Sequence, residues 1–429
     1  MRQIIRLYKD SYSGLSRSSW LLAFITLINR SGMMVLPFLG LYLTEDLKFT
    51  VQQAGVVLSI FGAGSMIGSY FGGYLADRIG YFKVVLFSLI GGGICFVLLT
   101  FVQSFYLLCV SILFASIITE SLRPAMTASI ANYSTKENTT RSFSLIRMAI
   151  NLGASIGPAL AGVLAVVGYV WIFIGDGLTC IAAGIAYYIY FKKQYATHKE
   201  KNEDSHVSEI ENQHEKKPGF INPFYDRIFI IFCFCTIGYA IVFFQMWNSL
   251  PLFYRNVHFL SEPAIGILLA LNGFIVFVFE MPVVYSFEKK YAIKHIIAVG
   301  ILLLSVAMML LNSTNHPFIL YVSMFLMSIS EILAMPFMMT LIIKRSNEMN
   351  RGKYIGIYSM TWSSAFIFAP LIGTYFIEHF NYATLWWVMS SICIITLACI
   401  LYAIEKMTQK TEQKVSVELI ETRNKKHII

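Results

Sequence analysis

Residues 73–83 read GYLADRIGYFK and place a charged pair, Asp77 and Arg78, between two long apolar stretches. The flanking residues 51–76 and 82–103 are each long enough to cross a bilayer as a helix, which takes about 20 largely apolar residues. Gly80 permits a tight turn, because glycine adopts backbone angles that other residues avoid. We therefore predict two membrane-spanning helices joined by a short charged turn.

The composition of the whole chain also indicates a membrane protein. Of its 429 residues, 57% are hydrophobic and 13% are charged, and the mean hydropathy is +0.65. That leaves too little polar surface to cover a soluble globule of this size. The basic start of the chain leads into an apolar stretch of full span length with no small-residue cleavage site, so we expect the first span to be retained.

Twelve stretches are long and apolar enough to be helical spans, which predicts an all-α membrane protein. They cover residues 18–43, 51–76, 82–103, 105–132, 139–166, 170–191, 227–254, 263–287, 293–312, 317–343, 353–377 and 382–404. One long hydrophilic segment divides six spans from six. We expect an N-terminal half at 1–192, a cytoplasmic linker at 193–225, a C-terminal half at 226–405 and an exposed cytoplasmic tail at 406–429.

The basic residues give the topology. Of the 33 Lys and Arg residues, all except Lys48 and Arg255 in outer connections and Arg30, Arg123 and Arg147 inside spans lie on the side of the termini and the linker. The positive-inside rule makes that side the cytoplasm. We expect a multi-pass protein of the plasma membrane with both termini inside. The net charge of +9 then reflects topology and anionic lipid, and we expect no nucleic-acid partner.

An internal repeat relates the two sets of six spans. A shift of 211 residues places Gly55 on Gly266 and Glu120 on Glu331, and it places the Asp77–Arg78 pair on Glu288 and Lys289. A shift of 212 residues places Pro158 on Pro370. Two parallel six-span repeats predict two pseudo-symmetric halves that rock about a central site.

Asp77 occupies an unfavourable position on its own helix. It sits at the carboxyl end of the second span, where the helix dipole already carries partial negative charge. Its carboxylate therefore needs compensation from Arg78, from a basic residue in another loop or from the amino end of another helix. Gly73, one turn earlier, removes a side chain where a second helix could approach.

The chain resembles the major facilitator superfamily over essentially its whole length. The family signature G-x-x-x-D-[RK]-x-G-[RK]-[RK] is matched by Gly73, Asp77, Arg78 and Gly80 and departs from the pattern at residues 81–82. The resemblance implies that Asp77 meets the amino end of span eleven, near residues 352–354, and latches the halves in the outward-open state. An ordinary charged turn is the simpler alternative.

Span five carries a second family resemblance. Its sequence NLGASIGPALAG resembles the G-x-x-x-G-P-x-x-G-G motif of the drug:proton antiporter branch, with matches at Gly153, Gly157, Pro158 and Gly162. Small residues allow helices to pack closely, and a proline bends a span. The resemblance points to export, although generic small-residue packing also explains the motif.

Ionisable residues inside the spans are the candidate functional residues. A charge near the bilayer centre costs at least about 2.5 to 3.5 kcal/mol, so each needs a partner or a water-filled cavity. They are Arg30, Glu120, Arg123, Arg147, Asp176, Glu280 and Glu331. In the family that the chain resembles, spans one, four, seven and ten line the central cavity. This predicts that Arg30, Glu120, Arg123 and Glu331 face it.

Spacing suggests roles for these charges. Glu120 and Arg123 are three residues apart and share a helix face, so they could pair, and Arg147 is expected at similar depth as another partner. Glu331 has no evident cation nearby in the sequence, and we favour it as the proton-binding residue, with Glu120 next. Asp176 and Glu280 are weaker candidates for proton coupling, because a helix contact or a hydrated rim would also explain them.

Polar residues of span seven complete the candidate cavity. Gln245 and Asn248 lie three residues apart in the aromatic and Met-rich stretch FFQMWNSLPLF, which suits amphipathic molecules. Any single aromatic residue there is more simply explained by packing. The seven cysteines lie in apolar stretches and none of the eight histidines is at mid-span, so we expect no metal, no cofactor and no histidine proton relay.

These observations predict a proton-coupled secondary transporter that exports amphipathic small molecules or drugs by alternating access. We expect it to act as a monomer in the lipid bilayer, with a small-molecule substrate and protons as its partners. Proton-coupled uptake of a zwitterion such as a short peptide is the alternative, since Arg30 with Glu120 or Glu331 could hold a carboxylate and an amine. A membrane enzyme has little support, because no phosphate-binding glycine loop or metal cluster is present.

Overall fold

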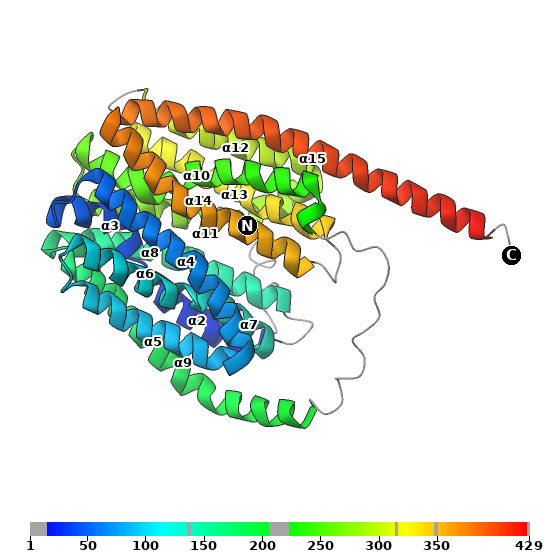
Figure 1. Cartoon of the computed structure of the whole chain (residues 1–429), viewed down its shortest axis with the longest axis horizontal. Coiled ribbons are helices and arrows are strands. Elements are labelled where there is room, and N and C mark those ends of the chain that lie inside the picture. The colour runs from blue at the N-terminus through cyan, green and yellow to red at the C-terminus, as the bar shows by residue number, and fades with distance from the viewer. Residues whose placement is uncertain (1–14, 135–138, 206–222, 314–315, 347–350, 427–429) are drawn as a thin grey trace, which may run out of the picture. The chain divides into compact units, whose positions relative to one another are not determined.

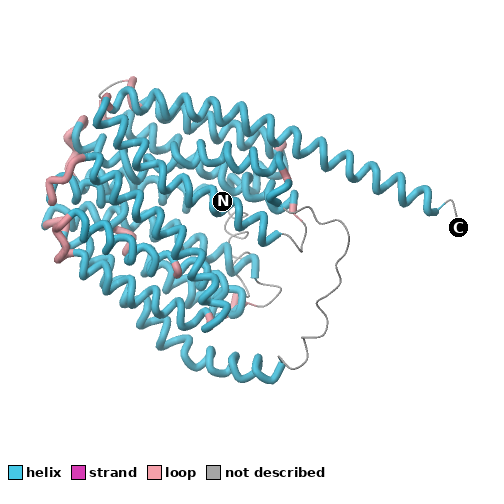
Figure 2. The backbone as a smooth tube through the Cα atoms, viewed as in Figure 1, coloured by secondary structure: helices cyan, strands magenta, loops and turns pink. Residues whose placement is uncertain are grey.

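The computed structural model describes residues 15–134, 139–205, 223–313, 316–346 and 351–426. These residues are almost entirely helical (Figure 2). Twelve segments of the described chain are long and apolar enough to cross a membrane. The prediction of an all-α chain with twelve spans is therefore confirmed.

The first six spans run from α2 to α9 (Figure 1). The elements are α2 (Arg17–Ser31), α3 (Val35–Leu41), the π-helical η1 (Tyr42–Asp46), α4 (Val51–Ile79), α5 (Tyr81–Leu99), α6 (Phe105–Glu120), α7 (Leu122–Tyr133), α8 (Thr139–Val167) and α9 (Val170–Ser205). The first span consists of α2, α3 and η1, and the fourth of α6 and α7. Two of these six spans are thus interrupted.

The remaining spans run from α10 to α15, after the short 3-10 turn η2 (Pro223–Tyr225). They are α10 (Arg227–Asn256), α11 (Glu262–Lys290), α12 (Ile293–Leu310), α13 (Phe318–Arg345), α14 (Arg351–His379) and α15 (Tyr382–Lys426). The tail that we expected after residue 405 continues α15 as helix, which extends well past α12 in Figure 1. Likewise α9 continues to Ser205, into the segment predicted as linker.

Contacts group the chain into two compact units. Unit 1 comprises residues 1–216, 245–278 and 366–381, and unit 2 comprises residues 217–244, 279–365 and 382–429. In unit 1, α2 packs on α8, α4 on α6 and α5 on α9, while in unit 2 α12 packs on α13 and α15. The boundaries cut through α10, α11 and α14, so each of these helices contributes to both units. We call one end of each unit the linker side. In unit 1 it is the end at which α9 ends, and in unit 2 it is the end at which α10 begins.

Aromatic packing stabilises the linker side of unit 1. Tyr81 and Phe82 are buried, and the Phe82 ring stacks on Tyr195 of α9 at 4.8 Å between centroids. Tyr81 meets Tyr133 of α7 edge to face at 5.8 Å. Such ring pairs stabilise by about 0.5–1.5 kcal/mol beyond their buried area. The two positions at which the sequence departs from the family signature therefore carry core residues that join α5 to α7 and α9.

Local capping fixes where several helices begin. The Ser16 side chain accepts a hydrogen bond from the Ser19 backbone N–H at the start of α2. Thr50 and Gln53 form a reciprocal capping box at the start of α4. In the same way Asp226 accepts from the Phe229 N–H at the start of α10. Each of these side chains satisfies an N–H group that the first helical turn leaves without a partner.

Candidate functional site

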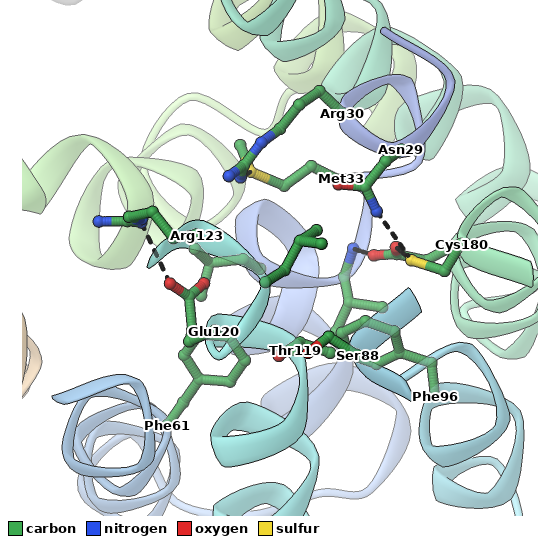
Figure 3. Close-up of a pocket in the computed structure, with 14 residues that line it drawn as sticks. Asn29, Arg30, Met33, Phe61, Ser88, Phe96, Thr119, Glu120, Arg123 and Cys180 are labelled. Atoms are coloured by element: carbon green, nitrogen blue, oxygen red, sulfur yellow. Dashed lines mark hydrogen bonds and ion pairs between the residues drawn. The ribbon is translucent and has the colours of Figure 1, made fainter. Parts of the chain in front are cut away.

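A cavity of about 70 Å³ lies among the spans of the first half, inside unit 1 (Figure 3). Its ionisable lining residues are Arg30, Glu120, Arg123, Asp176 and Cys180. The cavity is much smaller than the roughly 300–1,000 Å³ of a drug-sized pocket. In this conformation it has room for a few waters or a small charged group.

Both interrupted spans break beside this cavity, and a proline explains each break. A proline inside a helix lacks the N–H that would bond the carbonyl four residues earlier, and its ring crowds that carbonyl. Pro37 follows Met33 by four residues, where α2 has ended and α3 has not begun. Pro124 follows Glu120 by four residues, at the junction of α6 and α7.

The break in the first span is held by Asp176. Its Oδ2 atom accepts hydrogen bonds from the backbone N–H groups of Met34 and Val35, each at 3.2 Å. Gly32 at the break has no room for a side chain, which would overlap Thr179 of α9. Asp176 is 4% exposed. It therefore lies at a buried helix contact and not at a hydrated rim.

A thiol and an amide extend this contact. Cys180, one turn after Asp176, lies with its Sγ atom 3.6 Å from Asp176 Oδ1 and donates to it. The Asn29 amide donates to Cys180 Sγ at 3.3 Å. The contacts link α2 to α9, and the Asp176 carboxylate accepts from three donors, the Met34 and Val35 N–H groups and the Cys180 thiol. This satisfies the requirement that a buried charge be hydrogen-bonded.

Glu120 pairs with Arg123 across the second break. Arg123 Nη2 lies 3.1 Å from Glu120 Oε2, and the two side chains are 64% and 17% exposed. The approach is not aligned as a hydrogen bond, and Oε2 is a buried atom with no hydrogen-bond partner among the described residues. The charge of the Glu120 carboxylate is therefore only partly compensated, because its partner Arg123 is largely solvated.

Arg30 has a different environment. Its Nη1 atom lies 3.7 Å from the Met33 sulfur, and Figure 3 shows the side chain beside that thioether. No described carboxylate of unit 1 forms an ion pair with it. A guanidinium group within a membrane span is costly without a counter-charge. Arg30 is thus suited to attract a small anionic group.

The other predicted charges are not among the residues that line this cavity. Glu331 on α13 is half-buried, next to Ser330, whose hydroxyl lies 3.2 Å from the Tyr239 hydroxyl. Glu280 on α11 is buried, and Arg147 on α8 is exposed. Glu331 and Glu280 belong to unit 2. Their proposed roles in proton coupling stay predictions.

The two polar residues of span seven are buried in unit 1. Gln245 is fully buried, donates from Nε2 to the Ala369 carbonyl at 2.9 Å and accepts from the Ser249 hydroxyl at 2.5 Å. Asn248 is 4% exposed. Neither lines the cavity of Figure 3. Contact with substrate stays a prediction for both.

The span-five motif brings α8 against its neighbours. A side chain at Gly153 would overlap Arg30, and a Cβ at Gly157 would lie 2.8 Å from the Met33 carbonyl oxygen. A Cβ at Gly162 would lie 2.5 Å from the Glu262 carbonyl oxygen of α11. Pro158 lies inside α8 between these contacts. The motif therefore fixes the backbone of the first span beside its break.

The signature loop lies at the linker end of α4. Gly80 has φ of 90°, Arg78 lies over the Tyr74 ring at 4.6 Å, and Asp77 is exposed with no partner among the described residues of unit 1. A Cβ at Gly73 would meet only Pro124, at 3.8 Å. The tight approach of α4 to the fourth span is instead at Gly72, where a Cβ would be 2.6 Å from the Ser121 Cα.

Sequence reasoning missed two ionic clusters. In unit 2, Asp226 binds Arg345 and Tyr354. In unit 1, Arg255 binds Glu45 and Glu262. Each joins residues more than 100 positions apart, so neither helical spacing nor a local motif signals it. Pro37 and Pro124 were the available signals for the two breaks.

The described residues form twelve membrane-length spans, and ionisable side chains of the first six spans line a cavity. This is an architecture expected of a membrane transport protein. Comparison with families makes the class specific: the family model of the Major Facilitator Superfamily matches residues 19–259 and 235–426. The chain belongs to the major facilitator superfamily, and it resembles the drug:proton antiporter branch.

Its relatives include transporters with named activities. A Na⁺, Li⁺, K⁺/H⁺ antiporter of Planococcus maritimus is 25% identical over 368 residues, covering 80% of this chain and 85% of that protein. The quinolone resistance protein NorA of Staphylococcus aureus is 29% identical over 136 residues, which cover 32% of this chain and 35% of NorA.

Solved structures share the fold. A POT family transporter crystallised with 5-aminolevulinic acid superposes with a TM-score of 0.77, covering 92% of this chain and 98% of that chain. The sequence identity is 15%. The likeness therefore establishes the major facilitator fold and nothing finer.

Proposed function

We propose that this chain is a proton-coupled antiporter that exports amphipathic small molecules by alternating access. The observation that carries the proposal is the charge-lined cavity beside two proline-broken spans. Its volume of about 70 Å³ suits protons, water or one charged group, so the apolar part of a substrate would need to bind elsewhere along the pathway. The name of the Planococcus antiporter supports exchange against protons, and a relative named as a multi-drug resistance efflux pump, the PmrA homolog of Lactococcus lactis, supports export.

The roles of individual residues are part of this proposal. We assign proton binding to Glu331 first and to Glu120 next, with Asp176 and Glu280 as further candidates. The two breaks give Arg30 and Glu120 backbone neighbours that can rearrange, because broken helices in membranes occur where the backbone lines a cavity. Asp77 would act as the latch of the outward-open state. The protein would function as a monomer in the plasma membrane with both termini in the cytoplasm, without catalysing a chemical reaction.

Uptake of a zwitterion is the second candidate. It is favoured by the Arg30 guanidinium, which has no described carboxylate partner in unit 1, and by the partly compensated Glu120 on the same cavity. An anionic and a cationic group of one solute would match these two side chains. The two candidates differ in substrate and in the direction of movement relative to protons.

Purified full-length protein in liposomes tests the proposal. An imposed pH gradient is followed with an internal pH dye while cationic dyes and quinolones, dipeptides, or Na⁺ and K⁺ are added. If the protein is an exporter, an amphipathic compound should dissipate the pH gradient while it moves in the direction opposite to the protons. If the protein works in uptake, a dipeptide should drive protons in the same direction as its own movement. Liposomes with the Glu331→Gln protein are the matched control. If no compound or cation changes internal pH, proton coupling is wrong.

A further inference from the structure

Helices α10 and α15 make a close contact within unit 2. A side chain at Gly238 of α10 would overlap the Thr396 hydroxyl of α15, and its Cβ would lie 3.6 Å from the Ile392 side chain. Glycine at such a point allows two membrane helices to approach closely. The side chains that lie one turn away from this contact on the two helices are therefore brought within reach of each other.

Two cysteines occupy these positions. Cys235 precedes Gly238 by three positions, and Cys399 follows Thr396 by three positions. The thiols of Cys235 and Cys399 are hydrogen-bonded to each other. A step back along α10 thus matches a step forward along α15, so the two helices are antiparallel here. The thiol pair lies on the linker side of the glycine contact, because α10 begins at that side.

The thiol pair is accessible from outside the helix bundle. Cys399 is exposed and Cys235 is partly exposed. The exposed large side chains around them are apolar, namely Phe234 on α10 and Ile395 and Tyr402 on α15. An exposed apolar surface on a membrane span is what contact with lipid requires.

Both thiols lie well inside their spans. Cys235 follows the start of its span at Arg227 by eight positions, and Cys399 precedes the end of its span at Met407 by eight positions. At 1.5 Å per residue each thiol is about 12 Å from that end of its helix. Since the hydrocarbon core of a bilayer is about 30 Å thick, a compound that reaches the pair must be soluble in lipid.

Cys233, although close in sequence, is not part of the pair. It lies two positions from Cys235, and residues two apart on a helix do not face each other. Its thiol is buried and hydrogen-bonded to Thr361 of α14. Cys233 therefore provides an internal control for a thiol on the same helix that lacks a thiol partner.

We infer that Cys235 and Cys399 form a covalent ligand site, open to the lipid, for trivalent organoarsenicals. Arsenic(III) with one organic group and two hydroxyl groups can exchange both hydroxyls for the two cysteine sulfurs. Two As–S bonds form while two As–O and two S–H bonds break, and the hydroxyl groups leave as water with the thiol protons. Arsenic stays trivalent, so no oxidant or reductant is needed. The product carries no charge, which suits an apolar medium in which charge is costly.

A metal ion fits this pair less well than an arsenical. Zn²⁺ in a structural site takes four ligands from Cys, His and carboxylate side chains, and two thiols would leave half of them missing. Among the described residues no group of three or more His, Cys, Asp or Glu residues is placed to hold a metal. A trivalent arsenical with one organic group needs only two sulfurs, and the inference does not depend on the proposed transport function.

Binding of phenylarsine oxide to reduced, purified full-length protein in lipid nanodiscs tests the site. Intact-protein mass spectrometry should show a single adduct that survives excess 2-mercaptoethanol and is removed by 2,3-dimercaptopropanol. Cys235→Ser or Cys399→Ser should raise the concentration for half-occupancy about a hundredfold, because the second thiol no longer binds as an intramolecular ligand. Cys233→Ser is the matched control and should bind the arsenical as the wild type does.

A relocated thiol separates geometry from the number of thiols. Cys399→Ser combined with Ala398→Cys keeps seven cysteines and an exposed thiol on α15, but moves the sulfur about 100° around the helix. This protein should bind as weakly as Cys399→Ser alone. Equal thermal unfolding of the two variants and the wild type without arsenical shows that all three are folded.

Three outcomes would overturn the inference. The first is a wild-type protein that forms no dimercaptopropanol-sensitive adduct. The second is wild-type affinity in Cys399→Ser or in the relocated variant, which would place the arsenical on other thiols. The third is protection by Zn²⁺: preincubation with Zn²⁺ should leave the binding of phenylarsine oxide unchanged, and a strong loss of binding would assign the pair to a metal ion instead.

Discussion

Arg345 binds Asp226 through two nitrogens, with Nε 2.6 Å from Oδ2 and Nη2 2.8 Å from Oδ1. The Tyr354 hydroxyl donates to the same carboxylate at 3.0 Å, and Arg345 Nη1 approaches the Met407 carbonyl at 3.5 Å. The cluster thus ties the start of α10 to the end of α13, to Met407 inside α15 and to the first turn of α14, all within unit 2. The two charged side chains are only 11% and 3% exposed.

Arg345→Gln should lower the free energy of unfolding by about 3–5 kcal/mol, the usual cost of breaking a buried pair and leaving its partner uncompensated. Tyr354→Phe should cost only about 1 kcal/mol, because it removes one hydrogen bond and keeps the pair. Thermal unfolding of the detergent-solubilised proteins measures both. Equal losses in the two variants would contradict the ranking.

The same cluster predicts a pH dependence of stability. Burial alone would raise the pKa of Asp226, but the hydrogen bonds and charge of Arg345 and the bond from Tyr354 outweigh it, so the pKa lies below its ordinary range. The stabilisation is therefore fully present above the unfolded-state pKa of about 3.9 and is lost as pH falls through the lower folded-state pKa. The stability difference between wild type and Asp226→Asn should shrink in that acid window. A stability difference that grows as the pH falls would show that the pKa of Asp226 is not lowered in the folded protein.

Asp176→Ala should destabilise the protein by about 1–3 kcal/mol, because it leaves the buried N–H groups of Met34 and Val35 without an acceptor. Asp176→Asn retains an acceptor oxygen and should cost less. If Asp176 also binds the coupling proton, Asn should abolish proton-driven transport even where it folds normally. Unfolding and liposome flux, measured on the same preparations, distinguish a structural role of Asp176 from a role in proton coupling.

Arg123→Ala combined with Glu120→Gln tests the pair beside the second break. Since Arg123 is 64% exposed, we expect a coupling of only about 0–1 kcal/mol in a double-mutant cycle of unfolding. If Arg123 instead binds an anionic substrate group, Arg123→Ala should weaken substrate binding selectively, and the double variant should not recover it. Binding and thermal-shift measurements on the four proteins are needed. A coupling term clearly above about 1 kcal/mol would contradict this expectation and make the pair a structural unit.

Asp77→Asn should leave the protein inserted and folded while strongly impairing transport, because the amide keeps the shape of the side chain but loses the latch charge. Cysteine accessibility from the two sides of the membrane reports the change in conformational balance. Normal transport with unchanged accessibility would remove Asp77 from the mechanism. Glu378→Gln, near the end of α14, is a charge-matched control and should have little effect.

Glu331→Gln should abolish uphill movement driven by a proton gradient, because an amide cannot take up and release a proton. Substrate binding and exchange should persist, since the shape of the side chain is kept. Substrate accumulation and binding are both measured in liposomes. Uphill movement by the variant would place the coupling residue elsewhere, with Glu120 tested next.

The sequence alone determined the class of protein and the number of spans. The length of an apolar stretch decides whether a helix can cross a bilayer. The distribution of the basic residues and the internal repeat can both be read directly from the order of the residues. The pairing of Glu120 with Arg123 was also predictable, because residues three apart meet on one helix face. The prolines at 37 and 124 carried the information for both breaks, although we did not use it.

Only the tertiary structure decided which distant charges meet. Asp176 lies 142 residues from the N–H of Met34, and Arg255 lies 210 residues from Glu45. Helical periodicity fixes which residues share a face, but not which face of another helix packs against it. That choice depends on close contacts such as Gly153 against Arg30, where the absence of a side chain sets the distance between two backbones. The polar partners of a buried charge are therefore a property of packing, which single-helix spacing does not contain.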